Sequence, residues 1–149
     1  MIIEYFSDER YIYSIGFMFA YINIYKPKKV KLNLHDLKFN LEYNSWANQV
    51  RPIDVLNDMN NKKYKHEVLR IKNADTKYPI IVDSNYIILD GVHRYIKHII
   101  ENKKTIQVYI FDKNLMKKFI IGKRGEENDL QLNDYIELFN KRFKELPTI

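Results

Sequence analysis

The chain has 149 residues, a formal net charge of +6 and a pI near 9.3. A hydrophobic fraction of 46% with 14% aromatic residues is typical of a globular protein and excludes a disordered one. The absence of cysteine excludes disulfides, thiol catalysis and cysteine-based zinc sites, and it fits an intracellular (cytoplasmic) protein.

An apolar run without charges extends from Tyr11 to Tyr25. It is shorter than the roughly 20 residues that span a bilayer, and tyrosines interrupt it. The preceding residues are acidic rather than basic, so a signal peptide is not expected. We therefore expect no membrane interaction, and a buried strand or helix that ends near Pro27.

An alternating pattern follows. Val30, Leu32 and Leu34 alternate with polar residues, which predicts a half-buried strand. After a short turn, Phe39 and Leu41 continue the alternation, so we expect the apolar ladder to resume there.

Two helical patterns come next. Pro52 stands where a helix begins, and the apolar spacing after it predicts a helix to about Asn60. His66 and Arg70 are four residues apart, so on a helix they would share one face.

Near the centre of the chain, the spacing of the apolar residues changes from that of strands to that of a helix. Residues 78–82 and 85–89 are two β-rich runs joined by turn residues, which predicts a hairpin. The second run ends at Asp90-Gly91, and helical spacing then begins at Val92 and reaches Ile100. Asp90 is a good N-cap residue, and Gly91 has no Cβ to keep a ligand from the backbone.

The last third alternates strands and helices. The pattern predicts a strand over Thr105–Phe111, a short helix over Leu115–Ile120, a loop at 122–127 and a helix over Asn133–Leu146. Together with the earlier elements this is typical of an α+β fold with a small mixed sheet and flanking helices.

The turn before the central helix is a candidate anion site. The first N–H groups of a helix have no intrahelical partner, so those of Val92 and His93 could hold a phosphate. Arg94 adds the charged N–H donors of its guanidinium group, and His93 adds one further donor. Asp90 would repel a bare phosphate, so we expect it either to cap the helix or to face a divalent metal ion that a nucleotide carries.

The stretch Leu89-Asp90-Gly91-Val92-His93-Arg94 resembles the ParB/sulfiredoxin-like superfamily over roughly residues 28–112. In that superfamily a strand leads into a glycine-containing turn that ends in His-Arg and holds nucleotide phosphates. The form D-G-x-H-R is similar to the branch with free amino-acid kinases and ParB-like nucleases. Sulfiredoxins have cysteine where this chain has Val92, and chromosome-partition proteins have G-E-R-R in place of G-V-H-R.

The resemblance implies a nucleotide- or phosphate-binding protein, a small metal-dependent phosphotransferase or nucleotide hydrolase that uses Mg²⁺ with ADP, ATP or CTP. The phosphate- and nucleotide-binding residues that it implies are Gly91, Val92, His93, Arg94, His66 and Arg70. Catalysis would involve Asp90, Glu42 and His93, with Asp90 as the metal ligand. We expect Glu42 rather than Asp36 or Asp54 to be the base because it precedes Trp46, whose indole could form a pocket wall.

Two other classes of function remain open from the sequence. One is a nucleic-acid-binding protein or ParB-like nuclease, and the net charge predicts weak, salt-dependent binding to nucleic acid. The other is a catalytically inactive interaction module. A kinase needs a closed pocket beside residues 91–94, whereas a nuclease needs an open basic groove. The expected organisation is an apolar extension packed on the domain at 1–27, the ParB/sulfiredoxin-like domain at 28–112, and helices of the same domain at 113–149.

Overall fold

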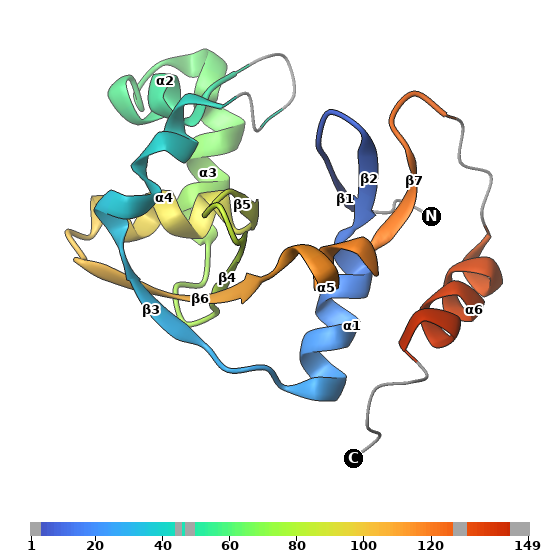
Figure 1. Cartoon of the computed structure of the whole chain (residues 1–149). Coiled ribbons are helices and arrows are strands. Elements are labelled where there is room, and N and C mark those ends of the chain that lie inside the picture. Colours follow the sequence, from blue (N-terminus) through green and yellow to red (C-terminus); the bar gives the residue numbers. More distant parts are fainter. Residues whose placement is uncertain (1–3, 44–45, 47–49, 127–130, 144–149) are drawn as a thin grey trace. The chain divides into compact units, whose positions relative to one another are not determined.

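The computed structural model describes residues 4–43, 46, 50–126 and 131–143. Helices and two small sheets confirm the α+β class (Figure 1). By their internal contacts the residues form two compact units: Lys28–Phe111, and a second unit that joins Met1–Pro27 to Asp112–Ile149. The sequence led us to expect the terminal segments as additions to the central domain, but they group with each other.

The terminal unit contains an antiparallel sheet in the order β1-β2-β7. Its elements are β1 (Tyr5–Ser7), β2 (Tyr11–Ser14), α1 (Ile15–Tyr25), α5 (Lys113–Lys117), β7 (Ile120–Lys123) and α6 (Leu132–Phe143). The apolar run is thus a strand followed directly by a helix, because the Ser14 side chain accepts a hydrogen bond from the Phe17 N–H and caps α1. No helix in the described ranges is long and apolar enough to cross a membrane.

Two boundaries in this unit differ from the sequence-based expectation. Ile120, expected at the end of a helix, begins β7, and this strand also takes in the start of the expected loop. It does so because β7 pairs with β2, an interaction between distant segments that local periodicity cannot reveal. The expected continuation of the last helix to Leu146 lies outside the described residues.

The central unit is built on a four-stranded mixed sheet in the order β3-β6-β4-β5. Its elements are β3 (Val30–Asn33), the 3₁₀ helix η1 (Leu34–Glu42), α2 (Pro52–Asn57), the 3₁₀ turn η3 (Lys62–Tyr64), α3 (Lys65–Asn73), β4 (Ile80–Asp83), β5 (Ile88–Asp90), α4 (Val92–Ile100) and β6 (Thr105–Phe111). β4 is parallel to β6, and the other pairs are antiparallel. The predicted hairpin, the helix after it and the following strand are confirmed.

The expected apolar ladder after β3 is wrong, because these residues form η1. Leu34, Leu37 and Asn40 recur every three residues, which is the repeat of a 3₁₀ helix, and all three are buried. Phe39, expected in the ladder, is exposed, whereas Leu41 is buried.

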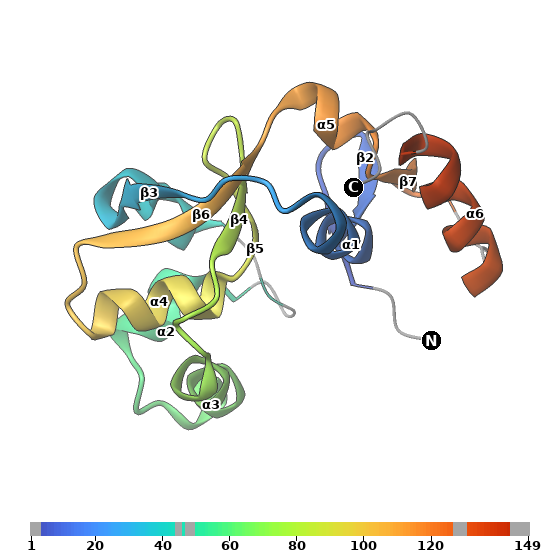
Figure 2. The ribbon, with the colours of Figure 1, turned by 90° about the horizontal axis from the view of Figure 1, so that it is seen from below.

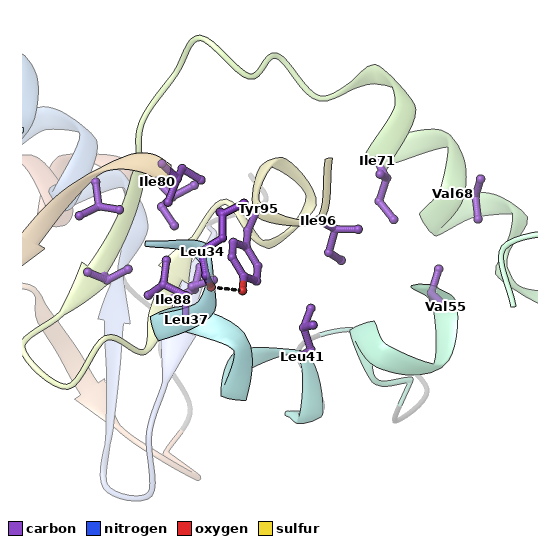
Figure 3. Packing of buried hydrophobic residues seen from close by; sticks show 13 residues of the cluster. Leu34, Leu37, Leu41, Val55, Val68, Ile71, Ile80, Ile88, Tyr95 and Ile96 are labelled. Carbon is purple, nitrogen blue, oxygen red and sulfur yellow. Dashed lines mark hydrogen bonds between the residues drawn. The ribbon is translucent and has the colours of Figure 1, made fainter. Parts of the chain in front are cut away.

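Helix α4 lies against one face of the central sheet, and α3 lies on the side of α4 away from the sheet (Figure 2). Tyr95 and Ile96 of α4 are almost fully buried in this core. Figure 3 shows both among leucine, isoleucine and valine side chains from η1, α2, α3 and the strands. The orientation of α4, and with it the position of its N-terminus, is therefore fixed by packing on two sides.

Asn40 ties the hairpin to η1. Its Nδ2 donates to the carbonyl oxygens of Leu37 and Tyr86, both at 2.9 Å, and its Oδ1 accepts from the Ile88 N–H at 2.9 Å. Because the side chain is buried, these bonds satisfy backbone groups that water does not reach. Asn40 thus holds the start of β5, the strand that leads into α4.

Tyr95→Phe is expected to lower the free energy of unfolding by about 1–2 kcal/mol. The Tyr95 hydroxyl donates to the Leu34 carbonyl at 2.7 Å, drawn as the dashed line in Figure 3, and burial raises the pKa of Tyr95 to about 12. The donor therefore persists at any ordinary pH, and its removal leaves a buried carbonyl without its partner. Urea denaturation measures the loss. Tyr43→Phe, at an exposed tyrosine, should change stability little, and equal values for the two variants would contradict the prediction.

Candidate functional site

The turn between β5 and α4 requires glycine. Gly91 has a φ of +107°, and a Cβ placed on it would lie 2.5 Å from Cγ2 of Ile80. Gly91 is itself the N-cap residue of α4, and within the described part of the chain no side chain caps the helix. The expectation that Asp90 caps α4 is therefore wrong, because Asp90 is the last residue of β5 and the left-handed glycine adds one residue before the helix.

Without a capping side chain, the helix N-terminus keeps its polar character. The N–H groups of Val92, His93 and Arg94 belong to the first turn, where no intrahelical acceptor exists. The peptide dipoles of α4 add partial positive charge at the same point. The geometry that the sequence predicted for an anion site is thus present at the backbone level.

A pocket of about 270 Å³ lies beside this N-terminus. It is lined by Arg70, Ala74, Asp75, Tyr78, Asp90, Gly91, His93 and Arg94. Arg94 donates from Nη2 to Oδ2 of Asp90 at 2.6 Å, and each of these two side chains is 21% exposed. Asp90 therefore holds the guanidinium of Arg94 beside Gly91, while the guanidinium keeps further N–H donors for a ligand.

His93 is part of a second polar pair at the same place. Its Nε2 lies 2.6 Å from Oε2 of Glu67 in the first turn of α3. The indole of Trp46 stacks on the imidazole, with ring centroids 4.7 Å apart and planes inclined by 17°. Glu67 and Trp46 together fix the plane of the ring and the nitrogen that carries its proton.

Burial lowers the pKa of His93 below its ordinary value of 6.5, although the hydrogen bond to Glu67 raises it; the nearby charge of Arg70 lowers it further. The imidazole is therefore neutral at pH 7. Because the Glu67 carboxylate accepts a hydrogen bond, Nε2 carries the proton and Nδ1 is an acceptor. Within the described residues Nδ1 has no hydrogen-bond partner.

Of the other residues that the sequence led us to expect at the site, some line the pocket and some do not. Arg70 lines the pocket, whereas His66 is exposed on α3, does not line it, and acts on His93 through its charge. Val92 contributes its N–H group, while its side chain packs against the core. Glu42, the expected base, is exposed at the end of η1 and does not line the pocket.

Sequence reasoning missed Glu67, Asp75 and Tyr78. Glu67 and Arg70 are three residues apart on α3, so a helical projection would have placed them on one face. What the projection could not supply is that this face meets the first turn of α4. Asp75 lies in the connection after α3, which has no periodic pattern, and Tyr78 stands at the start of the run expected as a strand, so no local signal indicates either of them as a pocket residue.

The donor set does not fit a resident metal ion. Oδ2 of Asp90 already accepts from the Arg94 guanidinium, whose positive charge opposes a cation at that oxygen. In the described part of the chain, no three His, Asp or Glu side chains gather as metal ligands would. Asp90 is therefore placed to hold Arg94 rather than an ion.

Comparisons with known proteins identify no relative of this chain. No protein-family model, no curated protein and no solved structure matches the chain.

Proposed function

We propose that the chain binds the phosphate of a nucleotide at the N-terminus of α4 and acts as a phosphotransferase or nucleotide hydrolase. The observation that carries the proposal is the pocket in which the first turn of α4, Arg70 and Arg94 meet beside Gly91. Backbone N–H groups at a helix N-terminus and planar guanidinium groups are the donors that proteins use for phosphate.

The balanced charge of the pocket supports a small ligand rather than a nucleic acid. Arg70 and Arg94 are balanced by Asp75 and Asp90 among the lining residues. A site with two arginines and two carboxylates suits one phosphate group, whereas a track for a nucleic-acid backbone requires an excess of positive charge along a surface. Nucleic-acid binding therefore stays the second candidate, on net charge alone.

The proposed base is His93. Neutral imidazole with Nε2–H donated to Glu67 can accept a proton at Nδ1 from an attacking hydroxyl group or water. Glu67 then stabilises the imidazolium that forms, as a carboxylate does in other carboxylate–histidine pairs. In this assignment Asp90 positions Arg94 and does not itself react.

Magnesium enters the proposal only as a companion of the nucleotide. Titration calorimetry of ADP, ATP and CTP, each with and without Mg²⁺, tests both the binding and the dependence on the metal. Absence of binding by every nucleotide at millimolar concentration would contradict the proposed function.

Arg94→Lys is expected to weaken nucleotide binding by about 1.5–3 kcal/mol, the range for hydrogen bonds to a charged group. A lysine ammonium is a point charge without the planar arrangement of donors in guanidinium, so it cannot reproduce the geometry of the bond to Asp90 together with a paired contact to phosphate. The measurement is the dissociation constant by calorimetry.

Arg51→Lys is the matched control for this variant. Arg51 forms an exposed ion pair with Asp54 at 3.0 Å and does not line the pocket. Its replacement should leave the dissociation constant unchanged. If both variants weaken binding equally, the effect does not come from the contacts of Arg94 in the pocket.

A further inference from the structure

A second pocket, of about 230 Å³, lies in the same unit. It is lined by Thr76, Lys77, Tyr78, His98, Thr105, Ile106 and Gln107. Tyr78 lines this pocket and also the one at the N-terminus of α4, so the two spaces adjoin through that residue.

His98 presents an unpaired acceptor to this second pocket. The side chain is only 8% exposed, and its Nδ1 lies 2.8 Å from the carbonyl oxygen of Arg94. A carbonyl only accepts, so Nδ1 carries the proton and Nε2 of the neutral ring is an acceptor. Nε2 has no partner in the described part of the chain, yet no buried side-chain nitrogen or oxygen there is unsatisfied. Nε2 must therefore reach open space, and the space that His98 borders is this pocket.

The edge of the sheet supplies another part of the pocket wall. β4 begins at Ile80, whose register partner on β6 is Val108. Residues 105–107 of β6 consequently extend beyond β4 and have no β4 partner, and they line the pocket. Backbone donors and acceptors at such an edge bind hydrogen-bonding groups of a ligand.

We propose that this pocket is a second subsite, for the neutral, hydroxyl-bearing part of the same phosphorylated ligand. The proposal rests on the proposed function, because it assigns the remainder of a ligand whose phosphate lies at α4. An acceptor at Nε2 requires a donor, which a sugar hydroxyl supplies and a second phosphate does not. The ligand class is therefore a sugar phosphate or the ribose phosphate of a nucleotide.

The first test uses the unmodified chain. Its amide chemical shifts are measured in solution, once with inorganic phosphate and once with ribose 5-phosphate. Phosphate is expected to shift the amides of residues 91–94 only. Ribose 5-phosphate is expected to shift these and also the amides of residues 105–107, with a dissociation constant at least tenfold lower than that of phosphate.

The second test removes the acceptor. His98→Asn keeps a side-chain N–H near the Arg94 carbonyl and loses Nε2. It should remove the affinity advantage of ribose 5-phosphate and leave the affinity for inorganic phosphate unchanged. His35→Asn, the same change at an exposed histidine of η1 outside both pockets, should retain the advantage.

The possible results separate the subsite from the function on which it rests. If phosphate shifts residues 91–94 but ribose 5-phosphate binds no tighter and leaves residues 105–107 unchanged, the subsite is wrong while phosphate binding stands. If neither ligand shifts residues 91–94, the proposed function fails and the subsite with it. If His98→Asn weakens both ligands equally, His98 supports the fold rather than the ligand, which also overturns the subsite.

Discussion

Gly91→Ala is expected to lower the free energy of unfolding by roughly 3–5 kcal/mol. An alanine at a φ of +107° is strained, and its Cβ would lie 2.5 Å from Cγ2 and 2.9 Å from Cβ of Ile80. It would also lie 3.2 Å from Nη2 of Arg94. Since Ile80 is fully buried in β4, it cannot move aside, so either β5 or the start of α4 must shift.

Gly125→Ala separates the two contributions to this loss of stability, which are the backbone strain at positive φ and the close contact with Ile80. Gly125 has a φ of +89°, but nothing lies within 4 Å of the Cβ that alanine would add. This variant should show the backbone strain alone, about 1 kcal/mol. Chemical denaturation of both variants gives the difference, and equal losses would contradict the close approach of Ile80 to Gly91.

Ligand binding should respond to Gly91→Ala as well. The bare Cα of Gly91 leaves room for the Arg94 guanidinium, so an added methyl group displaces the donor as well as the backbone. Even where the variant is folded at low temperature, we expect nucleotide affinity to fall at least tenfold. Calorimetry under conditions where circular dichroism shows a folded chain measures this effect.

The sequence was sufficient for the hairpin and α4 because their signals are local. Alternation, turn residues and a change to helical period lie within about twenty residues, and no distant segment is needed to interpret them. The same reasoning proposed Gly91 and Arg94 as site residues, since the N–H groups at a helix start favour an anion. It failed at 34–42, where short apolar spacings fit an alternating strand as well as a 3₁₀ helix.

The carboxylate that we propose to act on His93 could not be chosen from local signals. Glu42 and Glu67 both stand near apolar residues, and only the packing of α3 against α4 brings Glu67 to His93. The role of Asp90 likewise depends on the residue at which α4 begins. Had α4 begun directly after Asp90, the cap would have formed; the left-handed Gly91 instead leaves the carboxylate to Arg94.

Glu67→Gln is expected to lower turnover by roughly 10²–10⁴-fold, the usual contribution of a general base. A glutamine can donate to Nε2 of His93 and so favour the tautomer with the proton on Nδ1, which removes the acceptor. It also cannot stabilise the imidazolium. Nucleotide affinity should change little, because Glu67 does not line the pocket. Phosphate release from ATP, ADP or CTP measures turnover.

The dependence of turnover on pH distinguishes this role from a structural one. Neutral His93 is the active form and burial lowers its pKa, so turnover should be constant at neutral pH and decline only below pH 6.5, as the pH falls through that lowered pKa. Glu67 raises the pKa of His93. Glu67→Gln should therefore move the decline to lower pH while it reduces the maximum rate.

Two further glutamate variants complete the experiment. Glu101→Gln makes the same change at an exposed residue that lines neither pocket, and it should leave turnover and the pH profile unchanged. Glu42→Gln tests the base that the sequence favoured. If Glu42→Gln abolishes turnover while Glu67→Gln retains it with an unchanged pH profile, His93 is not the base, because Glu67 is the side chain that bonds to its ring among the described residues.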